Sequence, residues 1–373
     1  MLAWSPPSKE TTIGKQDPAV LKTPYVSFVS WGRNDSYTPE YAQRARRAVS
    51  FLAKQLEAAQ LDSEIIFVEW NPVQCKPKLI EEFGMPEASC HVSVRGIVVD
   101  SRYHMVFEGA SERGIHAAEA SNVGLRRARG RFATPKASDT IFSNELVGRI
   151  AHRNLDPGAM YRVNRHDIVD ARAFAVPDTE LLESLAAAES ECNGYIQQSP
   201  YWKIRDLHTN ACGDFTLMAT ERWHQIRGHA LDRTVLSLDV DSIAMHAAAA
   251  FGVRECRWPD ECRVYKPQHN SMNGRRISQQ WLPWQRALEQ PLVAMGAWDA
   301  VFRLRTAFDF PRRRVQGVDS VLGPSIEKNF LRDATDWAKG AIPSQSQPEN
   351  WGLADEALEI RTLCTGGWER AAG

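Results

Sequence analysis

The first third of the chain alternates strand-like and helix-like patterns. Residues 25–31 alternate apolar and polar side chains and are rich in strand formers, which predicts a strand. Residues 40–59 carry apolar side chains at helical spacing, behind an N-cap and a first-turn proline at Thr38–Pro39. Residues 64–70 contain an apolar run typical of a strand buried on both faces, and a further strand is predicted over 92–99. A strand, a helix and a strand in this order predict a right-handed crossover and a parallel pair.

The stretch 119–143 combines a cluster of arginines with a lone carboxylate. Its apolar spacing predicts a short helix stopped by Gly130, followed by an extended run from Phe132 to Ser138–Asp139. Ligands of α/β sheets bind outside the carboxyl ends of the strands. Four arginines precede this strand end: Arg126, Arg127, Arg129 and Arg131. Cations beside a carboxylate at a strand end suit a diphosphate that is held partly by arginine and partly through a metal ion. The alternative interpretation is that the arginines form the solvent-exposed face of the helix.

The rest of the chain continues the mixed pattern and then changes. Helices are predicted over 143–152, 178–190 and 238–251, and strands over 160–163 and 215–218. After about residue 273 the sequence turns to tryptophans, prolines and helical patches. The twelve tryptophans of the chain are expected to anchor a helical extension on the main domain, with a sugar-stacking platform as the alternative.

Composition narrows the class of protein. At 373 residues with a formal net charge of −1, the chain has no basic excess for nucleic acid, so any anion site is local. No stretch approaches the ~20 apolar residues that span a bilayer, which leaves only peripheral membrane contact open. The first 24 residues lack the apolar core of a signal peptide, which predicts a cytoplasmic enzyme. The seven cysteines are scattered without Cys-x-x-Cys pairs or zinc-ligand spacing, which indicates reduced thiols.

An ordered series of short motifs carries a resemblance to a known family. The series comprises the loop Arg33-Asn34-Asp35, the strand end Glu69-Trp70-Asn71, Asn122-x-Gly124, Ala128-Arg129-Gly130 and Ser138-Asp139. It resembles the donor half of a GT-A-fold glycosyltransferase, well over residues 24–145 and in outline over 205–270. The resemblance implies a Rossmann-related α/β sandwich with a mostly parallel central sheet flanked by helices and a helical C-terminal extension.

The resemblance also implies a domain organisation. Residues 1–24 would form a flexible leader, and residues 25–275 the glycosyltransferase domain. That domain would comprise a nucleotide-sugar donor half over 25–145 and an acceptor half over 146–275. Residues 276–373 would form the tryptophan-rich, mainly helical extension.

On the donor side, the resemblance assigns roles by position. Arg33, Asn34 and Asp35 would lie beside the base and ribose of a nucleotide-diphosphate sugar, where a plain Asx turn is the alternative interpretation. Glu69 would accept hydrogen bonds from the same groups, because a charge ending a buried strand must be paired or reach solvent at a cleft. Asn122 and Gly124 would fix the start of a helix near the donor sugar, with Arg126 or Arg129 facing phosphate.

The diphosphate would lie at Ser138 and Asp139, and Asp139 would bind a divalent metal, Mn²⁺ or Mg²⁺. The sequence supplies one carboxylate where the family motif has two, which gives a weak metal site. Lys136 could contribute a fixed positive charge instead. His269 lies where a late histidine of the family reaches the metal or the diphosphate, and an exposed polar loop is its other interpretation.

On the acceptor side, Asp239 and Asp241 open an alanine-rich helix after the loop Arg227-Gly228-His229. Acidic residues at a helix start also serve as caps, so Asp241 is predicted to cap the helix and Asp239 to be the general base. Asp214 is the third candidate base. The expected reaction moves a sugar to a hydroxyl of a glycan, lipid-linked or protein-linked acceptor, as in the synthesis of a surface polysaccharide. The competing hypothesis is a degenerate protein that binds nucleotide sugars or glycans without catalysis.

Two other enzyme classes fit less well. A nucleotidyltransferase would show a glycine-rich loop with lysine and arginine after the first strand, and Gly32-Arg33-Asn34-Asp35 is poor in glycine. A Rossmann dehydrogenase would show Gly-x-Gly-x-x-Gly at the same place, and the sequence has none there.

Overall fold

The computed structural model describes most of the first 268 residues and the end of the chain. The described ranges are 23–35, 40–83, 89–107, 109–111, 113–194, 207–231, 240–268, 347–364 and 367–370, with a few positions between 287 and 341. Of the single residues discussed above, Thr38, Pro39, Asp239 and His269 lie outside the described residues.

Four parallel strands form the centre of the main sheet. In spatial order they are β4 (Phe132–Pro135), β1 (Val26–Gly32), β2 (Ser63–Trp70) and β3 (Val92–Val99). Each of them except β4 is long, and nearly all their side chains are buried, as expected for strands covered on both faces. The predicted α/β class and the parallel centre of the sheet are confirmed.

The sheet continues on both sides of this centre. Beyond β4 lie β9 (Leu217–Ala219), β6 (Ala159–Arg162) and β10 (Arg254–Arg257), and beyond β3 lie β12 (Glu359–Cys364) and β13 (Gly367–Arg370). β9 runs antiparallel to both its neighbours, and β12 runs antiparallel to β3.

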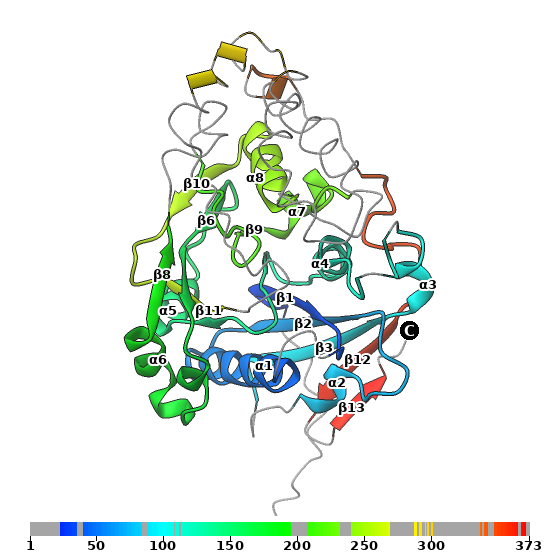
Figure 1. Ribbon diagram of the computed structural model, residues 1–373, viewed down its shortest axis with the longest axis vertical. Coiled ribbons are helices and arrows are strands. Elements are labelled where there is room, and N and C mark those ends of the chain that lie inside the picture. Colours follow the sequence, from blue (N-terminus) through cyan, green and yellow to red (C-terminus); the bar gives the residue numbers. More distant parts are fainter. Residues whose placement is uncertain are drawn as a thin grey trace, which may run out of the picture.

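Helices cover both faces of the sheet (Figure 1). On one face, α1 (Tyr41–Ala58) and α5 (Asn144–Ala151) pack on a core that includes Phe28 and Ile65. On the other face, α4 (Ala117–Arg126), α7 (Thr220–Ile226) and α8 (Val240–Ala250) pack on Val29 and Val68. Neighbouring residues of one strand thus belong to different cores, because strand side chains alternate between faces.

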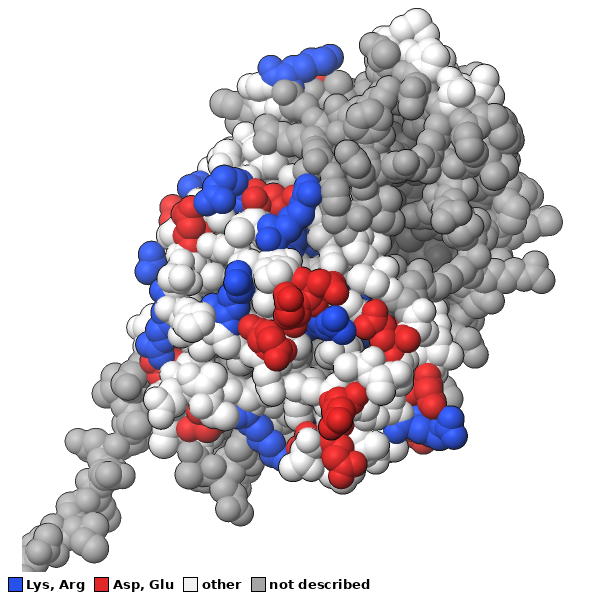
Figure 2. Space-filling view, turned by 90° about the vertical axis from the view of Figure 1, so that its left-hand side faces the viewer, with Lys and Arg blue, Asp and Glu red and all other residues white. Residues whose placement is uncertain are grey.

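A second, four-stranded sheet stands beside the main one. Its order is β5 (Ile141–Phe142), β11 (Arg263–Pro267), β7 (Asn164–Ile168) and β8 (Glu189–Asn193). The 3₁₀ helix Ala171–Phe174 and α6 (Asp178–Ala187) connect β7 to β8. On the side of the molecule that carries β8 and α6, Figure 2 shows acidic and basic side chains interspersed rather than segregated by sign.

The described end of the chain adds strands to the main sheet, and the mainly helical extension over 276–373 stays a prediction, because most of that range lies outside the described residues. Its described residues include β12 and β13, which extend the main sheet beyond β3. The preceding segment lies along α4, where the Arg127 guanidinium donates to the carbonyls of Gly352 and Leu353 at 2.6 Å each. Trp351 of this segment is 2% exposed. β12 supplies hydrogen-bond partners to the outer edge of β3, which would otherwise be open to pairing with other chains.

Several element boundaries need correction. α4 ends at Arg126 rather than at Gly130, and a Cβ at Gly130 would lie 2.6 Å from the Ser27 backbone nitrogen. Gly130 therefore allows close approach to β1 and does not stop the helix. The helix predicted over 178–190 ends at Ala187, and β8 begins two residues later. Within the described residues, no helix is both long enough and apolar enough to cross a bilayer.

Candidate functional site

The carboxyl ends of the central strands meet at one edge of the main sheet. The last residue of β1, Gly32, pairs with Glu69 near the end of β2, and Val29 pairs with Pro135 at the end of β4. The Lys136 amide continues this register by donating to the Val29 carbonyl at 2.8 Å. Because ligands of parallel sheets bind at this edge, we call it the end edge and place the candidate site there.

The loop after β1 is fastened to the loop after β2. Arg33 Nε donates to the Asn71 carbonyl at 2.5 Å, and Arg33 Nη1 lies 3.2 Å from Asp35 Oδ2. Asn34 Nδ2 donates to the Pro77 carbonyl at 2.9 Å. A Cβ at Gly114 would lie 2.1 Å from Arg33 Nη1, so the guanidinium passes directly over this glycine. The predicted residues of the first loop are thus brought together, with the Arg33 side chain 21% exposed.

Glu69 lies beneath this loop and contacts the backbone. Its side chain is fully buried, and its two oxygens accept hydrogen bonds from the amides of Leu79 and Ile80 at 2.9 and 3.0 Å. Those amides open α2 (Leu79–Glu82), just after the Pro77 carbonyl that holds Asn34. Burial raises the pKa of the Glu69 carboxyl to about 7, against the two backbone hydrogen bonds that lower it. Both oxygens thus hold the backbone at the start of α2, and a direct contact with ribose stays a prediction.

Ser138 and Asp139 are tied to the beginning of α1. The hydroxyls of Ser138 and Tyr41 share a hydrogen bond of 2.7 Å, and Arg44 Nε lies 3.4 Å from Asp139 Oδ2. A Cβ at Gly32 would lie 2.2 Å from the Tyr41 hydroxyl oxygen, so this contact is adjacent to the end of β1. The predicted convergence of β1, β2 and β4 on one edge is therefore present.

A buried ammonium lies next to Asp139. The Lys136 side chain is 1% exposed, and its Nζ donates to the Ala137 carbonyl at 3.2 Å. Burial lowers the pKa of Lys136 to about 7, although the negative charges of Asp139 and Asp214 act to raise it. An ammonium with a pKa near neutrality is unusual and marks this part of the edge as a candidate site.

Asp214 joins the same cluster from the loop before β9. Its carboxylate pairs with Arg165 Nη1 at 2.7 Å and with Lys266 Nζ at 2.8 Å, from β7 and β11 of the second sheet. Burial alone would raise the pKa of Asp214, but these two cations and their hydrogen bonds outweigh it and lower the pKa to about 2. A carboxylate with so low a proton affinity is a poor general base.

Asp241 holds the loop that carries Asp214. Its Oδ2 accepts the Gly213 amide at 2.8 Å, and its Oδ1 accepts the Ser242 amide at 2.9 Å. The buried Arg162 guanidinium fixes the same loop by donating to the carbonyls of His208 and Asn210. Asp241 lies in the first turn of α8, and its capping role stays a prediction. Asp239, the preferred base, lies outside the described residues and stays a prediction.

The arginines of 126–131 lie at the opposite edge of the sheet, which corrects our expectation. The Arg129 amide donates to Glu64 Oε1 at 2.5 Å, and the Arg131 amide donates to the Pro24 carbonyl at 3.2 Å. Both acceptors lie where the strands begin. Arg126 lies over the Trp351 ring at 5.2 Å. The reason is topological: a crossover helix returns the chain to the beginning of the next strand, so residues at its carboxyl end cannot lie at the end edge.

Asn122 lies in the middle of α4 rather than at its start. Its side chain accepts the His229 amide at 2.7 Å and donates to the His229 carbonyl at 2.9 Å. Gly124 packs against β1, where an added Cβ would lie 2.3 Å from Val29 Cγ1. Both predicted residues therefore hold helix and loop together, and their expected place beside the donor sugar changes accordingly.

The described residues do not fit the expected hard cation. Asp139 is the single carboxylate from the predicted motif, and it already faces Arg44 at 3.4 Å and the Lys136 charge. Mg²⁺ and Mn²⁺ favour several oxygen ligands, and two neighbouring cations oppose a third. His269, the other predicted metal ligand, lies outside the described residues. Lysine and arginine are the groups that can balance a diphosphate here.

Sequence reasoning missed Arg165 and Lys266, which complete the charge cluster with Lys136, Asp139 and Asp214. Each of the two missed cations sits in a polar-rich strand of the second sheet. Strand alternation can place such residues on one face, but nothing in their spacing along the chain announces that they meet Asp214.

Comparisons with known proteins give a structural likeness alone. No family model matches the chain, and no curated protein matches it. The structure is similar to that of S. aureus TarS 1–349 in complex with UDP-GlcNAc, with a TM-score of 0.42 and 12% sequence identity over 83% of this chain and 71% of that one. For the complex of TarS 1–349 with UDP, the TM-score is 0.42 and the identity 12%, over 90% of this chain and 96% of that one. The longer structure of TarS gives a TM-score of 0.41 at 12% identity, with 83% of this chain covering 55% of that chain.

Proposed function

We propose that the protein is a glycosyltransferase that moves a sugar from a nucleotide-diphosphate sugar to an acceptor hydroxyl. The observation that supports this most is the end edge itself. There, the Arg33-Asn34-Asp35 loop, the β2–α2 connection and Ser138–Asp139 adjoin, with Lys136 buried beside Asp139. A set of cations at the carboxyl ends of parallel strands suits a nucleotide with two phosphates.

The proposed roles follow from exposure and charge. Arg33 and Arg44 are partly exposed and would reach phosphate oxygens, while Lys136 would add positive charge from beneath them. In the reaction, the acceptor oxygen bonds to the anomeric carbon as the bond from that carbon to the phosphate oxygen breaks. The nucleoside diphosphate leaves with the electron pair, and its negative charge is balanced by these cations. Asp239 would take the proton of the acceptor hydroxyl.

A screen of nucleotides and nucleotide sugars by thermal shift, with and without Mn²⁺, tests donor binding, because a ligand of the folded state raises its melting temperature. UDP and UDP-GlcNAc, which TarS binds in its crystals, are the first compounds to include. We expect a shift without metal, because cations of the chain would balance the diphosphate, and a smaller shift in Arg44→Met. No shift with any donor would end the proposal.

The acceptor side has its own test. Asp239→Asn is expected to keep the donor-induced shift and to lose transfer to glycan or lipid-linked acceptors. If transfer survives in this variant, the base lies elsewhere. Candidate acceptors can be ranked by the release of free nucleoside diphosphate that they stimulate.

The second candidate function is a protein that binds nucleotide sugars or glycans without catalysis. One observation favours it: the described acidic candidates, Asp214 and Asp241, are both engaged by cations or backbone amides. The two functions differ in donor hydrolysis. Slow release of nucleoside diphosphate from a bound donor supports the enzyme, and donor binding without any release supports the binding protein.

A further inference from the structure

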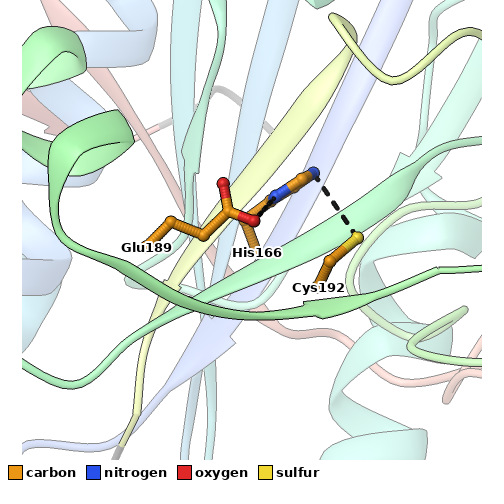
Figure 3. A group of neighbouring side chains, drawn as sticks. All are labelled: His166, Glu189 and Cys192. Carbon is orange, nitrogen blue, oxygen red and sulfur yellow. Dashed lines mark hydrogen bonds and ion pairs between the residues drawn. The ribbon is translucent and has the colours of Figure 1, made fainter.

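A histidine, a cysteine and two carboxylates gather on the second sheet, away from the end edge of the main sheet. Figure 3 shows His166 of β7 between Glu189 and Cys192 of β8. The ligand atoms of these three residues all lie within 4.8 Å of one another. Glu189 Oε1 is 2.8 Å from His166 Nδ1, and Cys192 Sγ is 4.0 Å from His166 Nε2. Asp260, from the β10–β11 connection, places its Oδ1 3.5 Å from the same Nε2.

The strand pairing explains this grouping. His166 and Cys192 are direct partners across the antiparallel pair β7–β8, which puts their side chains on one face. Glu189 is three residues from Cys192 and would face the other way in a regular strand. The register shift between Asp167 and Ile168 inserts one extra residue in β8, and this bulge turns Glu189 toward His166.

The two ring nitrogens of His166 have different surroundings. Nδ1 lies 2.8 Å from Glu189 Oε1 but makes no hydrogen bond among the described residues, so it is a buried nitrogen without a proton partner there. Nε2 faces one thiol and one carboxylate. Ligand atoms that share a tetrahedral zinc lie about 3.3–3.6 Å apart, given bonds of about 2.0 Å to nitrogen or oxygen and about 2.3 Å to sulfur. The ligand atoms of His166, Glu189 and Cys192 lie within 4.8 Å of one another, and the exposed Cys192 side chain can move toward the other two.

The charges around the cluster fit a divalent cation. Glu189 and Asp260 are both paired with Arg263, at 3.2 and 3.4 Å, so the described groups carry one excess negative charge before Cys192 ionises. Asp260 Oδ1 also accepts Asn164 Nδ2 at 2.8 Å, which orients this carboxylate toward the ring. A divalent ion and a thiolate would together neutralise the cluster, whereas an apolar or anionic ligand would not.

We propose that His166, Glu189 and Cys192 form a Zn²⁺ site, to which each contributes one ligand atom. Nitrogen, sulfur and oxygen ligands in this combination suit zinc better than Mg²⁺ or Ca²⁺, which take oxygen. Three protein ligands leave the fourth tetrahedral position to water. The ion would join β7 to β8, so its role is to hold the outer edge of the second sheet. It is independent of the sugar-transfer proposal.

The test uses the full-length protein after chelator treatment and dialysis. Addition of one equivalent of Zn²⁺ is expected to raise the melting temperature, and Co²⁺ in its place is expected to give a thiolate-to-cobalt charge-transfer band in the near ultraviolet. Cys192→Ser should abolish this band. Cys75→Ser, a change at another exposed cysteine, should keep it. Because Cys192 is exposed, its variant should fold, which circular dichroism verifies.

The carboxylate has a separate readout. Glu189→Gln removes the charge of one ligand, so it is expected to keep the cobalt band, which needs Cys192, and to weaken zinc binding at least roughly 10-fold, the smallest effect usual for the loss of even an outer partner. Unchanged zinc affinity in this variant would overturn the role of Glu189. Absence of a cobalt band in the wild type, or its persistence in Cys192→Ser, would overturn the site.

Discussion

The two edges of the central sheet both bury charges, but they bury them in different ways. We call the opposite edge, where the strands begin, the start edge. There, Glu64 accepts hydrogen bonds from Ser27 Oγ at 2.6 Å and from the Arg129 amide at 2.5 Å, and it pairs with Arg95 at 2.8 Å. Arg95 in turn donates to the Arg127 carbonyl at 2.6 Å. At the end edge, the one hydrogen bond of Lys136 Nζ to a described residue goes to the Ala137 carbonyl at 3.2 Å. The neighbouring carboxylates, Asp139 and Asp214, raise the pKa of Lys136 by their charge alone.

The difference separates structural charges from functional ones. A buried ion pair with several short hydrogen bonds has its solvation replaced, and it fixes the start of three strands. A buried ammonium without such replacement shifts its pKa toward neutrality, which is where groups that act on a ligand tend to be found. Four experiments test this contrast.

The largest effect is expected at the start edge. Arg95→Met leaves the Glu64 carboxylate buried without its cation, and removal of one partner of a buried pair costs about 3–5 kcal/mol of unfolding free energy. Urea unfolding followed by tryptophan fluorescence measures the loss. The double variant Glu64→Gln/Arg95→Met removes both charges and should recover part of it. A loss under about 1 kcal/mol in the single variant would place this pair with ordinary surface ion pairs.

At the end edge, the expected loss is in ligand affinity. Arg44→Met removes a cation next to Asp139, and a charge-assisted hydrogen bond is worth about 1.5–3 kcal/mol, or roughly 10- to 100-fold in the Kd of the nucleoside diphosphate identified by the screen. Isothermal titration calorimetry measures it. The matched control is Arg126→Met, at the start edge, which should leave the Kd unchanged. Equal losses in both variants would contradict the assignment of the two edges.

The pH dependence of stability isolates Lys136. Its pKa falls from 10.5 to about 7 on folding, so between these values the unfolded chain binds a proton that the folded chain does not. Stability should therefore rise with pH over this window, with a contribution of at most about 1.4 kcal/mol per pH unit. Unfolding free energies of the wild type and Lys136→Met are measured from pH 7 to 10. The value for the wild type minus that for the variant should increase with pH. Parallel curves would show that Lys136 keeps its ordinary pKa.

The smallest effect is expected at the junction of the two loops. Tyr41→Phe removes the hydrogen bond of 2.7 Å to the Ser138 hydroxyl, which should lower the unfolding free energy by about 1 kcal/mol. Thermal unfolding measures this change. An increase in stability would mean that the hydroxyl next to Gly32 is held at a cost.

Local patterns were sufficient for the elements that make the end edge. The strands over 26–32, 63–70 and 92–99 and the helix after the first of them follow the predicted ranges closely. These segments are long, and their apolar periodicity is strong, so burial and propensity favour the same structure. The position of the Arg33 loop, Glu69 and Asp139 at one edge of the sheet follows from these elements alone.

Contacts between distant segments were beyond the same reasoning. The arginines near Gly130 were assigned to the wrong edge because their closeness to Asp139 along the chain was taken for closeness in space. Asp214 and Asp241 looked like bases, and only their partners show that they hold a loop and two cations. His166, Glu189 and Cys192 have no zinc-type spacing, because a strand register and a bulge bring them together.

The pairing of β12 with β3 has a consequence for the synthesis of the protein. Glu359 pairs with Val98, so roughly 260 residues separate two neighbouring strands of one sheet. At about 5–20 residues per second, the outer side of β3 waits tens of seconds on the ribosome before its partner is made. During that interval the nascent sheet presents bare amides and carbonyls to other chains, and a chaperone that shields β3 would raise the yield of active protein.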